Sequence, residues 1–162
     1  MAKGHAAGLT VGWYTNNIEC HGQEQGWSNT PALHQKHYAG VASWLAKTGF
    51  DEVKVDSGGR FGDFDTWQRV LNATGRPIAL ENCHAGPLPN ASWCPYTQWR
   101  TGGDPDTAGW QNEMLSTAAK LSLARRGCWA YPGYAIWNGP AQNINLGDVI
   151  GWRASFGAHA IV

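Results

Sequence analysis

The 162-residue sequence carries little charge: Asp, Glu, Lys and Arg make up 15% of it, and the formal net charge is zero. Proteins that hold nucleic acid or an anionic membrane surface need a basic patch, so this balance argues against both partners. The sequence also lacks the run of roughly 18 apolar residues that a membrane-spanning helix needs. Its first residues, Met1 to His5, have no apolar core of the kind found in a signal peptide. We therefore expect a soluble chain whose partner is neutral.

Internal repeats, low-complexity segments and linkers are also absent, which predicts a single domain over residues 1–162. Tryptophan and glycine, by contrast, are abundant, with 10 and 21 residues. A flat aromatic ring can stack on a sugar, although for any single tryptophan a place in the core is the commoner reason. Two N-glycosylation sequons, at Asn72 and Asn90, and four cysteines are compatible with secretion.

Short β-prone runs alternate with longer helical stretches, which is typical of parallel strands joined by crossover helices. The expected strands cover residues 9–14, 53–56, 77–81, 96–99, 127–131 and 158–162, and the expected helices cover 33–47, 65–72 and 110–125. In the first helix we expect a buried face of Leu33, Val41, Trp44 and Leu45. Asp65 is the expected cap of the second helix, and Gly49, Gly75 and Gly127 follow the three helices as stop signals. The fold class is therefore α/β.

Polar residues cluster where the expected strands end. They are Tyr14, Asn16, Asp56, Glu81, His84, Arg100, Asp104 and Asn138. In (β/α)8 barrel enzymes the active site is built on the carboxyl ends of the strands. The cluster is therefore the candidate functional site.

Within the strand at residues 53–56, Lys54 and Asp56 point to the same face, because side chains alternate along a strand. A lysine beside an aspartate favours the ionised carboxylate, which a nucleophile needs. An ordinary ion pair on an edge strand has the same spacing, and spacing alone favours that explanation.

The segment Phe50 to Asp56, FDEVKVD, resembles the nucleophile strand of glycoside hydrolase family 27, which contains α-galactosidases and α-N-acetylgalactosaminidases. Four other segments resemble family motifs in the same order. Residues 8–14 resemble the third barrel strand, 99–104 (WRTGGD) the sixth, 127–132 (GCWAYP) the seventh, and 152–158 the approach to the eighth. The resemblance implies a partial (β/α)8 TIM barrel with about strands 3 to 8.

The implied activity is retaining hydrolysis of a terminal α-galactoside in an oligosaccharide or glycoconjugate. Asp56 would be the nucleophile and Asp104 the acid/base, with Tyr14, Lys54, His84 and Arg100 binding the substrate. Without the resemblance, Asp104 before Pro105 would be taken for a helix cap. The family uses no metal or other cofactor, and its members are secreted or located in lysosomes or vacuoles.

Four differences from the family pattern bear on activity. The first two strands, with paired aspartates that bind the sugar, are missing. His84 replaces a sugar-binding glutamate, with Glu81 nearby, and Gly133 replaces an aspartate after Pro132. Gly58 stands where Cys20 would find its disulfide partner. We therefore expect little or no activity from this chain alone.

The resemblance also implies a disulfide between Cys83 and Cys94, and it leaves Cys128 as a buried thiol. Cys and His residues could instead form a metal site in an unrelated α/β protein, but none has the C-x-x-C spacing of a structural zinc site. A further alternative is a carbohydrate-binding or degenerate homologue without catalysis. The sequence gives no indication of the oligomeric state.

Overall fold

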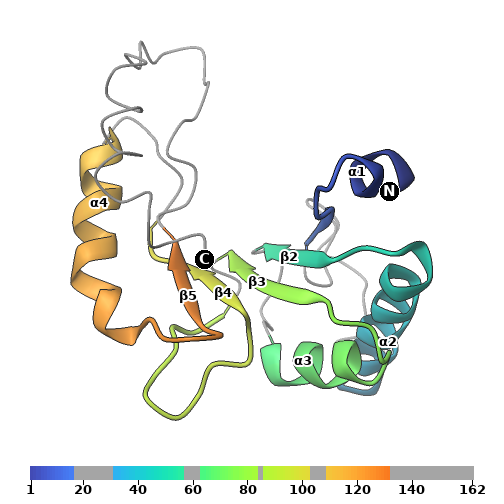
Figure 1. The fold of residues 1–162 in the computed structure, drawn as a ribbon. Coiled ribbons are helices and arrows are strands. Elements are labelled where there is room, and N and C mark those ends of the chain that lie inside the picture. Colours follow the sequence, from blue (N-terminus) through green and yellow to red (C-terminus); the bar gives the residue numbers. More distant parts are fainter. Residues whose placement is uncertain (17–30, 57–62, 84–85, 103–108, 132–162) are drawn as a thin grey trace. The chain divides into compact units, whose positions relative to one another are not determined.

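The computed structural model describes residues 1–16, 31–56, 63–83, 86–102 and 109–131. The chain falls into two compact units, residues 1–98 and 99–162, which are described in turn. The elements in chain order are α1 (Ala2–Ala6), β1 (Gly12–Asn16), α2 (Pro31–Thr48), β2 (Glu52–Asp56), α3 (Phe64–Asn72), β3 (Ala79–Cys83), β4 (Gln98–Arg100), α4 (Gly109–Lys120), a 3-10 turn (Leu121–Leu123) and β5 (Trp129–Tyr131) (Figure 1). The α/β class is confirmed.

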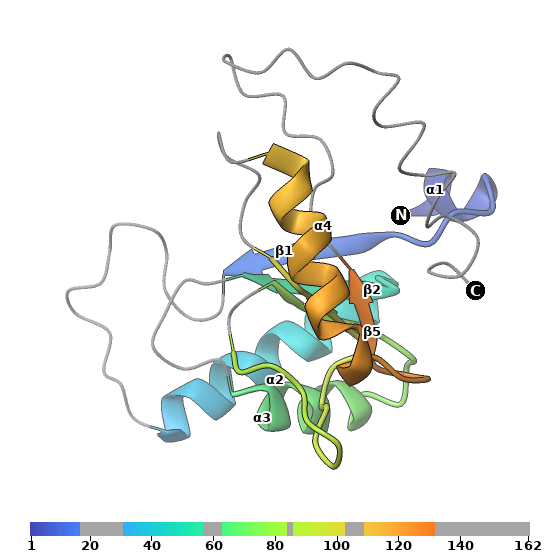
Figure 2. The ribbon, with the colours of Figure 1, turned by 90° about the vertical axis from the view of Figure 1, so that its left-hand side faces the viewer.

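In the first unit the strands β1, β2 and β3 follow one another in the sheet in chain order. β1 pairs with β2, and β2 with β3, both in parallel. The helix α2 connects the first pair and α3 the second, and both helices cover the same face of these strands (Figures 1 and 2). Repeated strand–helix–strand units with parallel strands in chain order are the building plan of a (β/α)8 barrel.

The strands of the first unit have an apolar face and a polar face. Val53 and Val55 of β2 and Leu80 of β3 are buried and point toward α2 and α3. The side chains between them in sequence point the other way, because alternate residues of a strand face opposite sides. The polar face is therefore the face away from the helices.

The core between the sheet and the helices is aromatic. Tyr38 of α2 and Trp67 of α3 are fully buried, with ring centroids 4.5 Å apart. Ala42 and Leu45 extend the buried stripe of α2 at helical spacing. Trp44 was expected in that stripe, but it is 42% exposed and packs at the rim against Trp13 of β1.

The sequence correctly predicted the residue that ends α2, but it predicted the wrong capping residue for α3. Gly49 ends α2 with a φ of 86°, a left-handed conformation that glycine adopts without strain. The predicted cap of α3 is wrong: Asp63, not Asp65, accepts a hydrogen bond from the backbone nitrogen of Thr66, at 2.9 Å. Asp65 lies within the helix and accepts a hydrogen bond from Nε1 of Trp93.

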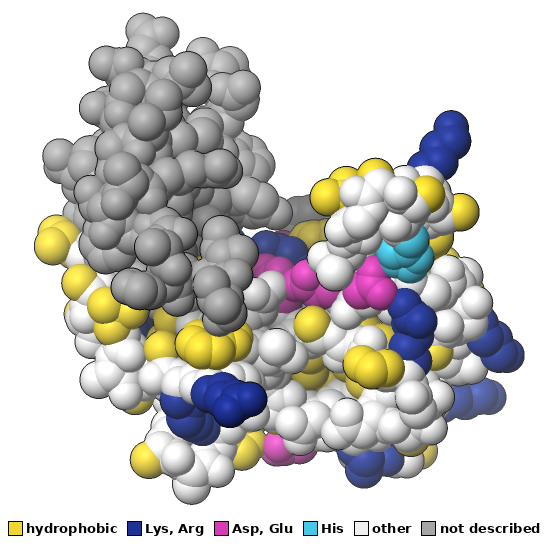
Figure 3. Space-filling view, in the orientation of Figure 1, with side chains coloured by type: hydrophobic (Ala, Val, Ile, Leu, Met, Phe, Trp, Pro, Cys, Tyr) yellow, Lys and Arg dark blue, Asp and Glu magenta, His cyan; other side chains and the backbone are white. Residues whose placement is uncertain are grey.

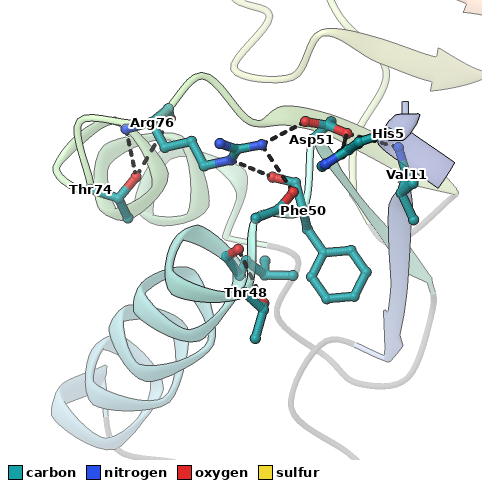
Figure 4. A network of polar contacts seen from close by, with 9 residues as sticks. His5, Val11, Thr48, Phe50, Asp51, Thr74 and Arg76 are labelled. Carbon is teal, nitrogen blue, oxygen red and sulfur yellow. Dashed lines mark hydrogen bonds and ion pairs between the residues drawn. The ribbon is translucent and has the colours of Figure 1, made fainter. Parts of the chain in front are cut away.

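Asp51, directly before β2, connects three segments of the first unit (Figure 4). Its Oδ2 accepts a hydrogen bond from the backbone nitrogen of Val11, at 2.8 Å, and lies 2.7 Å from Nε2 of His5. Its Oδ1 lies 2.6 Å from Nη2 of Arg76. The Val11 hydrogen bond, followed by the contact with His5, lowers the pKa of Asp51 below its ordinary value. This network ties β1, β2 and the segment before β3 together at the amino-terminal edge of the strands.

In the second unit, hydrogen bonds to Thr101, the residue after β4, hold α4 in place. The hydroxyl groups of Thr101 and Thr117 lie 2.6 Å apart, and Ser116 donates a hydrogen bond to the carbonyl oxygen of Thr101 at 2.8 Å. The backbone nitrogen of Thr101 donates to the carbonyl oxygen of Tyr131 next to it, at 2.9 Å. The predicted helix ends five residues too late, at residue 125, since α4 ends at Lys120.

The remaining predictions shift by a few residues or fall outside the described part. The predicted strand at 77–81 occupies 79–83, and the predicted strand at 158–162 lies outside the described residues. The short helix α1 was not predicted. Among the described helices, none combines the length and the apolar character needed to cross a membrane.

Candidate active site

The polar face of β1, β2 and β3 brings together three of the predicted site residues. The parallel register places Tyr14 beside Lys54 and Asn16 beside Asp56. It also places Lys54 beside Glu81 of β3. Tyr14, Lys54 and Asp56 therefore share one surface, as alternation along each strand predicts.

Tyr14 and Asp56 are joined directly. The hydroxyl group of Tyr14 donates a hydrogen bond to Oδ2 of Asp56, at 2.6 Å. A hydrogen bond to a carboxylate stabilises its ionised form and fixes its orientation. Tyr14 is half exposed and Asp56 is partly exposed, so solvent reaches this pair at the carboxyl end of β2.

Deeper along the same face, Lys54 forms an ion pair with Glu81. Nζ of Lys54 lies 2.7 Å from Oε1 of Glu81, and the two side chains are 15% and 10% exposed. Little water screens a pair at this burial, so the attraction is stronger than in a surface ion pair. Lys54, which was predicted to lie beside Asp56, therefore lies beside the carboxylate of Glu81 as well.

Two further side chains join this group. Nε2 of Gln98 donates a short hydrogen bond to Oε1 of Glu52 and another, at 3.2 Å, to Oε2 of Glu81. Burial raises the pKa of Glu52 from 4.5 to about 7, and the hydrogen bond with Glu81 and its negative charge act in the same direction. Gln98 and Lys54 partly oppose the rise. Figure 3 shows Asp and Glu side chains gathered on the viewed face, with Lys and Arg close by.

The sequence-based prediction missed Glu52 and Gln98. Glu52 precedes Lys54 and Asp56 at a spacing of two, so alternation alone would have placed it on their face. For Gln98 the sequence holds no comparable signal, because its contacts depend on which strands lie side by side.

The other predicted site residues lie either in the second unit or outside the described residues. Arg100 is buried on β4 in the second unit. His84, Asp104 and Asn138 lie outside the described residues, as do Cys20, Gly58 and Gly133.

The predicted disulfide is wrong. Cys83 is a buried thiol, whereas Cys94 and Cys128 are disulfide-bonded cysteines. The prediction of Cys128 as a buried thiol is wrong for the same reason. Within the described residues, His, Cys, Asp and Glu side chains form no group of three or more that could hold a metal ion.

No protein-family model and no curated protein matches the sequence. Among solved structures, the chain is similar to Abp-WT, a GH27 β-L-arabinopyranosidase from Geobacillus stearothermophilus, with a TM-score of 0.58 and 20% sequence identity. The likeness covers 78% of this chain, which spans only 38% of the length of the other. At this identity the likeness concerns the fold: the chain has the α/β fold of one part of a family 27 glycoside hydrolase.

Proposed function

We propose that the protein is a glycoside hydrolase with Asp56 as its nucleophile. The observation that carries the proposal is the position of Asp56, at the carboxyl end of β2, where it accepts the hydrogen bond from Tyr14. In barrel enzymes this end of a strand is where catalytic side chains are placed. The likeness in fold to a glycosidase agrees with this assignment.

The proposed reaction is retaining hydrolysis in two steps. Asp56 attacks the anomeric carbon and forms a covalent glycosyl ester, while Asp104 protonates the departing oxygen; Asp104 then deprotonates the water that cleaves the ester. Tyr14 holds the Asp56 carboxylate in its ionised form and in a fixed orientation. The role of Asp104 rests on its position four residues after Arg100 in the sequence.

The proposed substrate is a terminal α-galactoside of an oligosaccharide or glycoconjugate. α-D-Galactopyranose and β-L-arabinopyranose have the same ring configuration and differ by the hydroxymethyl group on C5. The family resemblance and the arabinopyranosidase neighbour therefore point to one shape of sugar ring. The two substrates are distinguished by the group that the sugar carries on C5.

The test combines turnover with covalent labelling. The chain is incubated with aryl α-galactopyranoside and aryl β-L-arabinopyranoside, and separately with a galactose-configured epoxide that alkylates glycosidase nucleophiles. We expect slow turnover at most, and labelling of Asp56 detected by peptide mass mapping. Asp56→Asn should abolish both, whereas Asp65→Asn, the same change at an exposed position of α3, should leave both unchanged. Equal labelling of wild type and Asp56→Asn would overturn the nucleophile assignment.

The second candidate is a sugar-binding protein without catalysis. It is favoured by the exposed aromatic side chains of the first unit, Trp13, Tyr14 and Trp44, because flat aromatic rings stack on sugar rings. In that case galactose would bind wild type and Asp56→Asn alike, measured by NMR shift changes, and the epoxide would label neither protein.

A further inference from the structure

Glu52 lies under the candidate site, between three strands. Its side chain rests over Gly12 of β1, where a methyl group added to Gly12 would lie 3.6 Å from Oε2 of Glu52. On its other side it meets Gln98 of β4 and Glu81 of β3. The carboxyl group is therefore enclosed by neighbouring strands.

One amide nitrogen holds both carboxyl groups of this cluster. Nε2 of Gln98 donates to Oε1 of Glu52 and to Oε2 of Glu81, so the two carboxyl groups meet at one atom. Two ionised carboxylates that accept hydrogen bonds from the same nitrogen atom lie close enough to repel each other. A single proton shared between them removes this repulsion.

The neighbouring cation decides which carboxyl group keeps the charge. Nζ of Lys54 lies 2.7 Å from Oε1 of Glu81, so the ammonium group stabilises negative charge on that oxygen. A proton held by Glu52 would then be donated in a hydrogen bond to Glu81. With one proton the three side chains are neutral in sum: zero for Glu52, −1 for Glu81 and +1 for Lys54.

We propose that Glu52 is a neutral carboxylic acid whose proton, shared with Glu81, keeps Lys54 paired with Glu81 beneath Asp56. When Glu52 releases this proton to solvent base, a second negative charge competes for the ammonium group and draws it along β2, away from Asp56. Glu52 is in this sense a positioning residue that acts through Lys54. Its effect on Asp56 rests on the proposed function, whereas the shared proton does not.

Several other groups face this cluster from the packed elements. On its own strand these are Lys54 and Asp56. On β1 and β3 they are Tyr14, Glu81 and Cys83, which alternation places on the same face, and on β4 it is Gln98 of the first unit. Among these charged groups, Glu81 and Lys54 act directly on the Glu52 carboxyl group, Glu81 through a hydrogen bond and its charge and Lys54 through its charge.

The shared proton is tested by following the glutamate carboxyl carbons with 13C NMR as a function of pH. We expect one carboxyl resonance with a midpoint near 7 in the wild type, absent from Glu52→Gln and kept in Glu113→Gln, a matched change on α4. If every glutamate titrates near the ordinary value of 4.5, the proposal is overturned. This readout needs no catalysis, so it is independent of the proposed function.

A second measurement separates positioning from a purely structural role. The folded state binds the Glu52 proton more tightly than the unfolded chain, so the free energy of unfolding should fall as pH rises from 4.5 to about 7. Glu52→Gln, which keeps the shape without the titration, should flatten this fall.

The rate of epoxide labelling of Asp56 should decrease across the same pH range in wild type, and Glu52→Gln should remove that decrease. An identical labelling profile in both proteins would refute the positioning role while leaving Asp56 as nucleophile.

Discussion

Arg76 binds Asp51 across the amino-terminal edge of the strands, with Nη2 of the arginine 2.6 Å from Oδ1 of the aspartate. The same guanidinium group donates hydrogen bonds to the carbonyl oxygens of Phe50 and Gly49, each at 2.9 Å (Figure 4). These carbonyl groups lie where α2 has ended and β2 has not begun. Arg76 therefore supplies donors to backbone groups that neither element satisfies.

Replacing Arg76 should destabilise the first unit without changing the site chemistry. Arg76→Met removes all three interactions, and Arg76→Lys cannot reproduce the planar fork, so both should unfold earlier. We expect Tm to fall by about 4–8 °C for Arg76→Met and by less for Arg76→Lys. Thermal unfolding followed by circular dichroism measures this, with Arg69→Met on α3 as the matched control. An unchanged Tm for Arg76→Met would show that water replaces the lost donors at no cost.

Local patterns in the sequence were enough to find the main elements of the first unit. Glycine after a helical stretch marked the end of α2, and the run of β-branched and charged residues marked β2. The cap of α3 was missed because Asp63 and Asp65 both suit a helix start, and only the backbone conformation chooses between them.

The arrangement of the site was predicted in part. Alternation placed Lys54 and Asp56 on one face, and the ends of the expected strands placed Tyr14 in the same cluster, but the convergence of Glu52, Glu81 and Gln98 depends on strand register. The cysteine pairing failed for a related reason: four cysteines allow several pairings, and spacing in the sequence does not select among them.

The cap assignment of α3 can be tested with a single side chain. Asp63→Ala removes the acceptor for the backbone nitrogen of Thr66 and should lower the free energy of unfolding by about 1 kcal/mol. Asp63→Asn should restore most of it, because Asn caps helices about as well as Asp. Urea unfolding measures both variants. A loss of the same size in Asp63→Asn would mean that the negative charge, and not the cap hydrogen bond, stabilises the helix start.

Tyr14→Phe tests a contact of the site that touches Asp56 directly. The change removes a hydrogen bond of 2.6 Å to the carboxylate and leaves the ring in place. Because this bond orients the proposed nucleophile, we expect the rate of epoxide labelling of Asp56 to fall about tenfold. The half-exposed position of Tyr14 means that Tm should change little. Tyr96→Phe removes a buried hydroxyl group that donates to the carbonyl oxygen of Pro87, so it should lower Tm and leave the labelling rate unchanged. If Tyr14→Phe instead labels at the wild-type rate, the hydrogen bond to Asp56 holds the strands together and contributes nothing to the reaction.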